Sequence, residues 1–185
     1  HKILGEYGCG ISHCPSPAIL GGFPILPMKK LKEYGVLLSL GCDGSATNDG
    51  SSLLDSIRTA YMMQCYHSKE RGGGVPAYEI LKQATINGAK TLGRNDIGSL
   101  EAGKAADLFM IDAGALELVG AVHDPRNIIG RVGLTGNVHM TMINGRVVYE
   151  NGRLVTVDER QLAKEGEKIC DKVLRGPCDA FHNLF

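Results

Sequence analysis

The feature that most constrains the fold is a near-continuous apolar run from Val36 to Leu40, inside the segment "GVLLSLGCDGSATNDG" at 35–50. The run lacks the polar and apolar alternation of a half-buried strand, and it is typical of a strand covered on both faces. A helix is expected just before it over 27–35, with a proline at its start and a glycine at its end. This order predicts a parallel sheet and an α/β fold class.

The rest of the first half repeats the alternation of strand and helix. A short strand is expected at 9–13, running into a proline-rich loop. Apolar residues at helical spacing predict two helices, one within 52–66 and one over 77–93. Because alternating strands and helices build α/β units, we assign residues 1–95 to one such region.

The pattern becomes β-rich from about residue 96. A strand is expected at 106–111, and two strand-like runs flank Asn144-Gly145, the pair preferred in type I′ hairpin turns. A second Asn-Gly pair follows at 151–152. We therefore expect a separate β-rich region over 96–156.

The chain should end in an amphipathic helix over 157–175. Asp158 stands at its start with Gln161 three residues later, the spacing of a capping box. The final segment, 176–185, matches no pattern and is left unassigned. The apolar side of the helix is expected to comprise Leu162, Ile169, Val173 and Leu174.

Composition excludes several classes of function. With 185 residues and 43 % apolar content, the chain can bury a core of one domain or somewhat more. The 20 basic and 20 acidic residues cancel, so no basic field would attract nucleic acid or anionic lipid. The apolar stretches fall short of the roughly 18–20 residues of a membrane span. Six cysteines without a C-x-x-C pair indicate reduced thiols, and we expect a cytoplasmic protein.

Two polar residues follow the two expected strands, and each has two readings. Asp43 comes directly after the buried strand, where Asp-Gly is a common turn, but where α/β folds also keep their chemistry. His13 ends the earlier strand, where a lone histidine is more often a loop or core residue than a ligand. Together they are too few ligands for a catalytic zinc, which takes three protein groups.

Several motifs, in this order, resemble those of a known superfamily. They are "GISHCPSP", "GVLLSLGCDGSATNDGSSLLDSIRTA", "EILKQATINGAKTLGRNDIGSLEAGKAADLFMID", "AVHDP" and "NVHMTMINGRVVYENGRLV". The chain resembles the amidohydrolase superfamily over roughly residues 3–165, in its cytosine/guanine deaminase and triazine hydrolase branch. Within that branch it is most similar to 8-oxoguanine deaminase-like enzymes.

The resemblance implies a (β/α)8 TIM barrel flanked by a small β-sandwich, with one divalent metal, zinc or alternatively iron, at the barrel mouth. Asp43 matches the aspartate ligand after strand eight. The H-x-H pair after strand one, the histidine ligand after strand five and the substrate-contacting histidine after strand six would all precede His1. This chain therefore resembles the C-terminal part of such an enzyme, and the N-terminal part or another chain would supply the rest.

The resemblance also implies a chemistry: hydrolysis of a C–N bond in a small heterocyclic substrate, an aminopurine or aminopyrimidine, by metal-activated water. Asp43 would accept the water's proton and pass it toward the leaving amine. His13, which lies in a His-Cys-Pro element that is not a metal ligand in the family, is a weaker candidate for substrate contact. Ser45, Thr47 and Asn48 are similar candidates, with a loop-building role equally open.

Two alternatives stay open. The enzyme could instead be a triazine chlorohydrolase or N-alkylaminohydrolase, or the chain could be a non-catalytic scaffold module. We expect the 185-residue chain alone to be inactive, and the whole enzyme to be a homo-oligomer that acts without nucleic acid or membrane.

Overall fold

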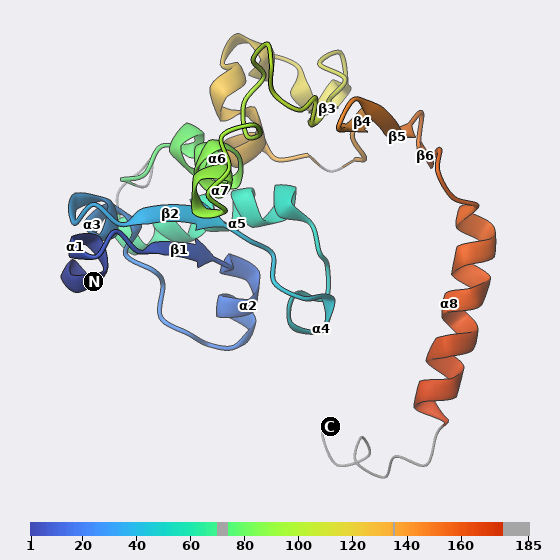
Figure 1. Cartoon of the computed structure of the whole chain (residues 1–185), viewed down its shortest axis with the longest axis horizontal. Coiled ribbons are helices and arrows are strands. Elements are labelled where there is room, and N and C mark those ends of the chain that lie inside the picture. Colours follow the sequence, from blue (N-terminus) through green and yellow to red (C-terminus); the bar gives the residue numbers. More distant parts are fainter. Residues whose placement is uncertain (70–73, 135, 176–185) are drawn as a thin grey trace.

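The computed structural model describes residues 1–69, 74–134 and 136–175 (Figure 1). The segment 176–185 lies outside the described residues. In chain order the elements are α1 (Lys2–Glu6), β1 (Gly10–His13), α2 (Pro15–Leu20), α3 (Met28–Glu33), β2 (Leu37–Leu40), α4 (Ser45–Asn48), α5 (Leu53–Ser68), α6 (Ala77–Ala84), α7 (Ile86–Thr91), β3 (Leu108–Met110), the short helices η1 (Leu116–Leu118), η2 (Ala121–His123), η3 (Pro125–Asn127) and η4 (Ile128–Val132), β4 (Met140–Ile143), β5 (Arg146–Glu150), β6 (Arg153–Leu154) and α8 (Glu159–Leu174).

The two strands of the first half form the expected parallel pair. β1 and β2 run in register from Gly10 opposite Leu37 to His13 opposite Leu40. The last three residues of β2 are buried, and α3, α5, α6 and α7 all contact this strand. The expectation of a covered strand at 36–40 is therefore confirmed.

One continuous hydrophobic cluster fills the space between these helices and β2. Its most completely buried members are Leu31, Ala60 and Ile80, each 0 % exposed. The cluster as a whole comprises Met28, Leu31, Val36, Leu38, Leu40, Ile57, Ala60, Val75 and Ile80. All of these residues lie within the first region, so the parallel pair is held by a core of its own.

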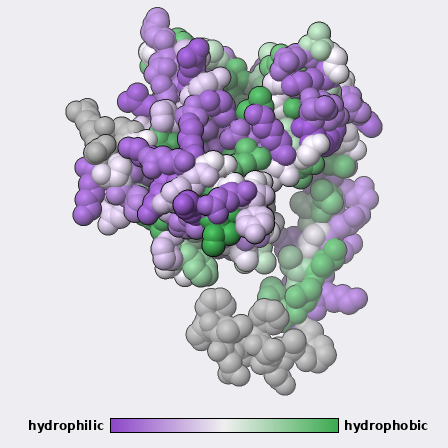
Figure 2. Space-filling view, turned by 60° about the vertical axis from the view of Figure 1, so that its left-hand side comes forward, coloured by the Kyte–Doolittle hydropathy of each residue, from purple (hydrophilic) through white to green (hydrophobic). Residues whose placement is uncertain are grey.

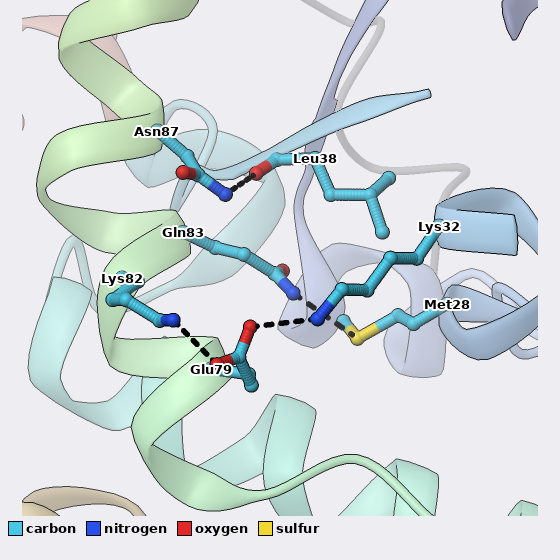
Figure 3. A network of polar contacts seen from close by, with 7 residues as sticks. All are labelled: Met28, Lys32, Leu38, Glu79, Lys82, Gln83 and Asn87. Atoms are coloured by element: carbon cyan, nitrogen blue, oxygen red, sulfur yellow. Dashed lines mark hydrogen bonds and ion pairs between the residues drawn. The ribbon is translucent and has the colours of Figure 1, made fainter. Parts of the chain in front are cut away.

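Polar contacts add to this core by fixing α3, α6 and α7 around β2 (Figure 3). Asn87 of α7 donates from Nδ2 to the carbonyl oxygen of Leu38 at 2.9 Å, which satisfies a backbone acceptor of β2. Glu79 of α6 accepts from the ammonium groups of Lys32 in α3, at 2.9 Å, and of Lys82. The position of β2, and of the residues that follow it, is thus fixed from several elements.

Two helical segments differ from the sequence-based expectation. The segment 77–93 is two helices, because the backbone of Thr85 leaves the helical region at φ −122° and ψ −97°. The Thr85 hydroxyl donates to the carbonyl of Leu81, four residues back, a local bond that competes with regular helix. The proline-rich loop contains α2, whose first residue is Pro15, where a missing N–H costs nothing.

The β-rich region is an antiparallel sheet in the order β3-β4-β5-β6. Its β4–β5 turn has φ +48° at Asn144 and φ +77° at Gly145, which confirms the predicted type I′ geometry. Asn151 and Gly152, at φ +52° and +81°, repeat it between β5 and β6. No residue of these four strands is buried.

The last helix, α8, stands apart from the rest of the molecule (Figure 1) and has no buried residue. The carboxylate of Asp158 accepts from the N–H groups of Arg160 and Gln161, so the predicted cap is present. The Gln161 amide donates from Nε2 to Glu165, and among the described contacts no bond from the Asp158 N–H to the Gln161 side chain completes the capping box. No described helix, α8 included, is long and apolar enough to cross a membrane.

Candidate active site

The carboxyl ends of β1 and β2 lie side by side, because the last residues of the two parallel strands are paired. We call this end of the pair its carboxyl edge. His13 is the last residue of β1, and Asp43 lies three residues beyond the end of β2. Gly41 donates its N–H to the carbonyl of His13 at 2.8 Å, which extends the pairing past the strand ends. The parallel register therefore brings both candidate residues to the same edge, where barrel enzymes place their chemistry.

Asp43 adopts an uncommon backbone conformation. Its φ of +62° lies in the left-handed region, which aspartate tolerates better than most residues. The Oδ1 atom accepts from the N–H of Gly44 at 2.8 Å, and the residue is exposed. The expected Asp-Gly turn is thus present, and it leaves the carboxylate accessible to a ligand.

The loop after Asp43 uses its own hydroxyl groups for structure. Ser45 and Ser51 share a hydrogen bond of 2.7 Å between their Oγ atoms, and Thr47 donates to the carbonyl of Gly44 at 3.0 Å. Asn48 ends the single turn of α4 and is half-buried. In this chain Ser45 and Thr47 hold the loop together, which is the structural role left open for them.

His13 is placed differently from Asp43. Its side chain is 6 % exposed, and Nε2 has no hydrogen-bond partner among the described residues. Burial lowers the pKa of the imidazole to about 4, so the ring is neutral near pH 7. A neutral ring with a buried, unpartnered nitrogen at this edge fits a contact to a group outside the described residues.

Two further residues of this edge were not singled out from the sequence. A Cβ on Gly41 would lie 2.9 Å from Oγ of Ser12 and 3.1 Å from Sγ of Cys14, so the turn after β2 has room only for glycine. Burial, and next the negative charge of Asp43, raise the pKa of the Cys14 thiol, which disfavours a nucleophilic thiolate. The sequence signal for this tight turn was Gly41, which directly follows the apolar run.

The described residues supply at most part of a metal site. Among residues 1–69, 74–134 and 136–175, no three His, Cys, Asp or Glu side chains cluster closely enough to hold a metal ion. Asp43 offers one carboxylate, whereas a catalytic zinc takes three protein ligands and a water. The further ligands of such a site must come from outside the described part of the chain.

Comparison with known proteins decides the family. The profile described as "Amidohydrolase family" matches residues 2–148. This chain belongs to the amidohydrolase family. Among curated relatives, this amidohydrolase is 42 % identical over 174 residues to the hydroxydechloroatrazine ethylaminohydrolase of Pseudomonas sp. (strain ADP), covering 94 % of this chain and 36 % of the relative. It is 29 % identical to the 5'-deoxyadenosine deaminase of Methanosarcina mazei, covering 94 % and 39 %.

Solved structures of amidohydrolases share its fold. The zinc complex of atrazine chlorohydrolase from Arthrobacter aurescens TC1 superposes with a TM-score of 0.84 at 30 % identity, covering 91 % of this chain and 37 % of that one. An adenosine deaminase from Xanthomonas campestris with bound zinc gives 0.81 at 28 % identity, covering 93 % and 39 %. The chain thus spans less than two fifths of the length of these relatives, all of them hydrolytic enzymes by name.

Proposed function

We propose that this amidohydrolase is the C-terminal part of a zinc-dependent enzyme that removes an amino substituent from a nitrogen heterocycle. The observation that carries the proposal is the place of Asp43, an accessible carboxylate directly beyond a buried parallel strand. Two structures similar to this chain carry zinc. By name, three of the relatives are an ethylaminohydrolase or deaminases, and one is a chlorohydrolase.

In this proposal β1 and β2 are the last two strands of a (β/α)8 barrel, within residues 1–95. The sheet of residues 96–156 belongs to a flanking β-sandwich, and 157–175 forms the terminal helix. The share of 36–39 % in the relatives' length supports a preceding N-terminal part that completes both units. We call the longer chain that contains this part the full-length enzyme.

Asp43 has two roles in the proposed reaction. Its carboxylate is one protein ligand of zinc, and zinc when bound lowers the pKa of water toward 7. The same carboxylate accepts the proton of the attacking water and delivers it to the departing amine nitrogen. The left-handed backbone and the bond from Gly44 orient the carboxylate for both tasks.

The substrate is an aminopurine or aminopyrimidine, of which an 8-oxoguanine-like ring is the first candidate. The 42 % identity to an ethylaminohydrolase of a triazine favours a second candidate, an alkylamino-triazine. In either case the buried neutral ring of His13 is a candidate hydrogen-bond partner of the substrate, with weaker contacts from Ser45, Thr47 and Asn48. The five described cysteines are all unpaired, which suits a cytoplasmic enzyme, and we expect a homo-oligomer.

The test is Asp43→Asn in the full-length enzyme, assayed for amine release from aminopurines, aminopyrimidines and alkylamino-triazines. We expect turnover of the best substrate to fall on the order of 10³-fold or more, since proton transfer typically contributes 10²–10⁴-fold and a zinc ligand is lost as well. Asp49→Asn is the matched control, because Asp49 lies in the same loop with a similar φ of +58°. Near-normal turnover in the Asp43 variant would remove this residue from the mechanism.

A further inference from the structure

The helix α8 carries an apolar face that no described residue covers. At 100° per residue its small and apolar side chains fall within a sector of about 140°. Four of them are between 54 % and 78 % exposed, namely Leu162, Ile169, Val173 and Leu174. The small and apolar members of the sector are Leu162, Ala163, Gly166, Ile169, Cys170, Val173 and Leu174, and Glu159 in the first turn is the one charged residue within it.

The opposite face of α8 is charged and mixed in sign. Lys164, Lys168 and Lys172 alternate there with acidic residues such as Asp171, which pairs with Arg175 at 3.4 Å. Membrane-surface helices are rich in basic residues on their polar face, so this mixture argues against a lipid partner. A helix of this length is marginal in water, and its stability comes mainly from packing of the apolar face.

The apolar face points inward. Figure 2 shows hydrophobic side chains of α8 on the side turned toward the rest of the molecule, and hydrophilic ones along the outer side. Figure 1 shows that α8 nevertheless stands away from the other elements. Whatever covers this face must therefore lie between α8 and the first region.

The comparisons show how much of a relative has no counterpart in this chain. The zinc-bound Xanthomonas structure covers 93 % of this chain, which leaves fewer residues unmatched than the 16 of α8, so the match reaches into this helix. The rest of that chain, about three fifths of it, has no counterpart here. Each strand of the β1–β2 pair also has one edge without a strand partner among the described residues. One large occupant accounts for both the apolar face of α8 and these strand edges.

We propose that the apolar face of α8 binds the N-terminal part of the same full-length enzyme. The inference rests on the proposed function, which supplies that part. In the full-length enzyme α8, which follows the antiparallel sheet in the chain, packs against elements of that N-terminal part. A second copy of the chain and a lipid surface are the occupants that it rejects.

Cys170 is a reporter on this face, because it is exposed and lies in the apolar sector. The rate of its alkylation by iodoacetamide is measured by peptide mass spectrometry in the 185-residue chain and in the full-length enzyme, each at several protein concentrations. We expect labelling at least 10-fold slower in the full-length enzyme, independent of concentration. Equal rates overturn the proposal, as does protection that disappears on dilution.

A pair of variants keeps the proposal testable by a second route. Ile169→Glu in the full-length enzyme should lower Tm and restore fast labelling of Cys170, whereas Lys168→Glu on the opposite face should do neither. If light scattering finds instead that the 185-residue chain forms a dimer that Ile169→Glu abolishes, the occupant is a second copy and the proposal is wrong. The labelling experiment needs neither metal nor turnover. A negative labelling result, which would overturn the proposal for α8, is therefore distinguishable from a result that removes Asp43 from catalysis.

Discussion

The first region and the rest of the molecule differ in how far they bury their own apolar surface. Residues 1–95 enclose the hydrophobic cluster around β2, with Leu31 and Ile80 fully buried. Beyond residue 95 the buried apolar side chains that the structure describes are Leu118 and Ile128. Both lie in short helices, and η4, which begins at Ile128, packs against α5 and α6 of the first region.

The difference shows which parts of this amidohydrolase depend on contacts beyond the described residues. The sheet β3–β6 and the helix α8 have regular hydrogen bonding but no buried side chain, and burial is the main stabilising contribution to folding. Asp43 and His13 lie in the first region, which holds the buried hydrophobic cluster. The candidate site therefore rests on strands with a buried core, while the remaining sides of the site are open to solvent among the described residues.

The largest expected effect tests this contrast directly in the 185-residue chain. Leu31→Ala should lower the free energy of unfolding by about 3 kcal/mol, because it leaves a cavity in a fully buried cluster. Leu162→Ala on α8 should change it by less than about 0.5 kcal/mol, because that side chain is exposed. Urea denaturation measures both. Similar losses in the two variants would break the comparison.

The second effect concerns pH and the buried imidazole of His13. Its pKa is about 4 in the folded chain and near the ordinary 6.5 when unfolded, so acid protonates the unfolded chain first. The stability present above pH 6.5 should be lost as the pH falls from 6.5 toward 4, by up to about 3 kcal/mol. His13→Gln should flatten this part of the curve of unfolding free energy against pH. His139→Gln, at an exposed position of the β-rich region, is the control. If the slope of unfolding free energy against pH is unchanged in the His13 variant, the account is contradicted.

A smaller effect is expected at two glycines. Gly41→Ala should cost about 1–3 kcal/mol of unfolding free energy, because the new Cβ meets the side chains of Ser12 and Cys14. Gly166→Ala on α8 meets nothing within 4 Å in this chain and should be neutral or stabilising by up to about 1 kcal/mol. Thermal unfolding of the two variants gives the sign of each change. A stabilising Gly41→Ala would mean that the strand ends are loosely packed.

Sequence reasoning predicted best where a local rule and the tertiary packing agree. The apolar run at 36–40 predicted a covered parallel strand, and the β1 partner and surrounding helices agree with that pattern. Asn144-Gly145 predicted the hairpin, which needs only neighbours in sequence. The break at Thr85 was not predicted, since it depends on the backbone conformation of one residue within an otherwise helical pattern. The amphipathic pattern of α8 predicted a helix correctly but could not identify what covers it.

The sequence predicted where the candidate site lies, but not how its residues are buried and packed. The sequence predicted that His13 and Asp43 each come at the end of a strand, and the parallel register then places both ends side by side. The burial of His13 and the close contacts around Gly41 come from the fold, which no spacing in the sequence encodes. The sequence contains no H-x-H pair, which is why it predicts that further zinc ligands lie outside this chain.

The central claim is that Asp43 holds a metal ion in the full-length enzyme, and zinc content measures it most directly. Elemental analysis by inductively coupled plasma mass spectrometry should find one zinc per chain in the purified enzyme and at least tenfold less in Asp43→Asn, with cooperative unfolding retained. The Asp49→Asn control should keep its zinc. Full zinc occupancy in the Asp43 variant would contradict the account.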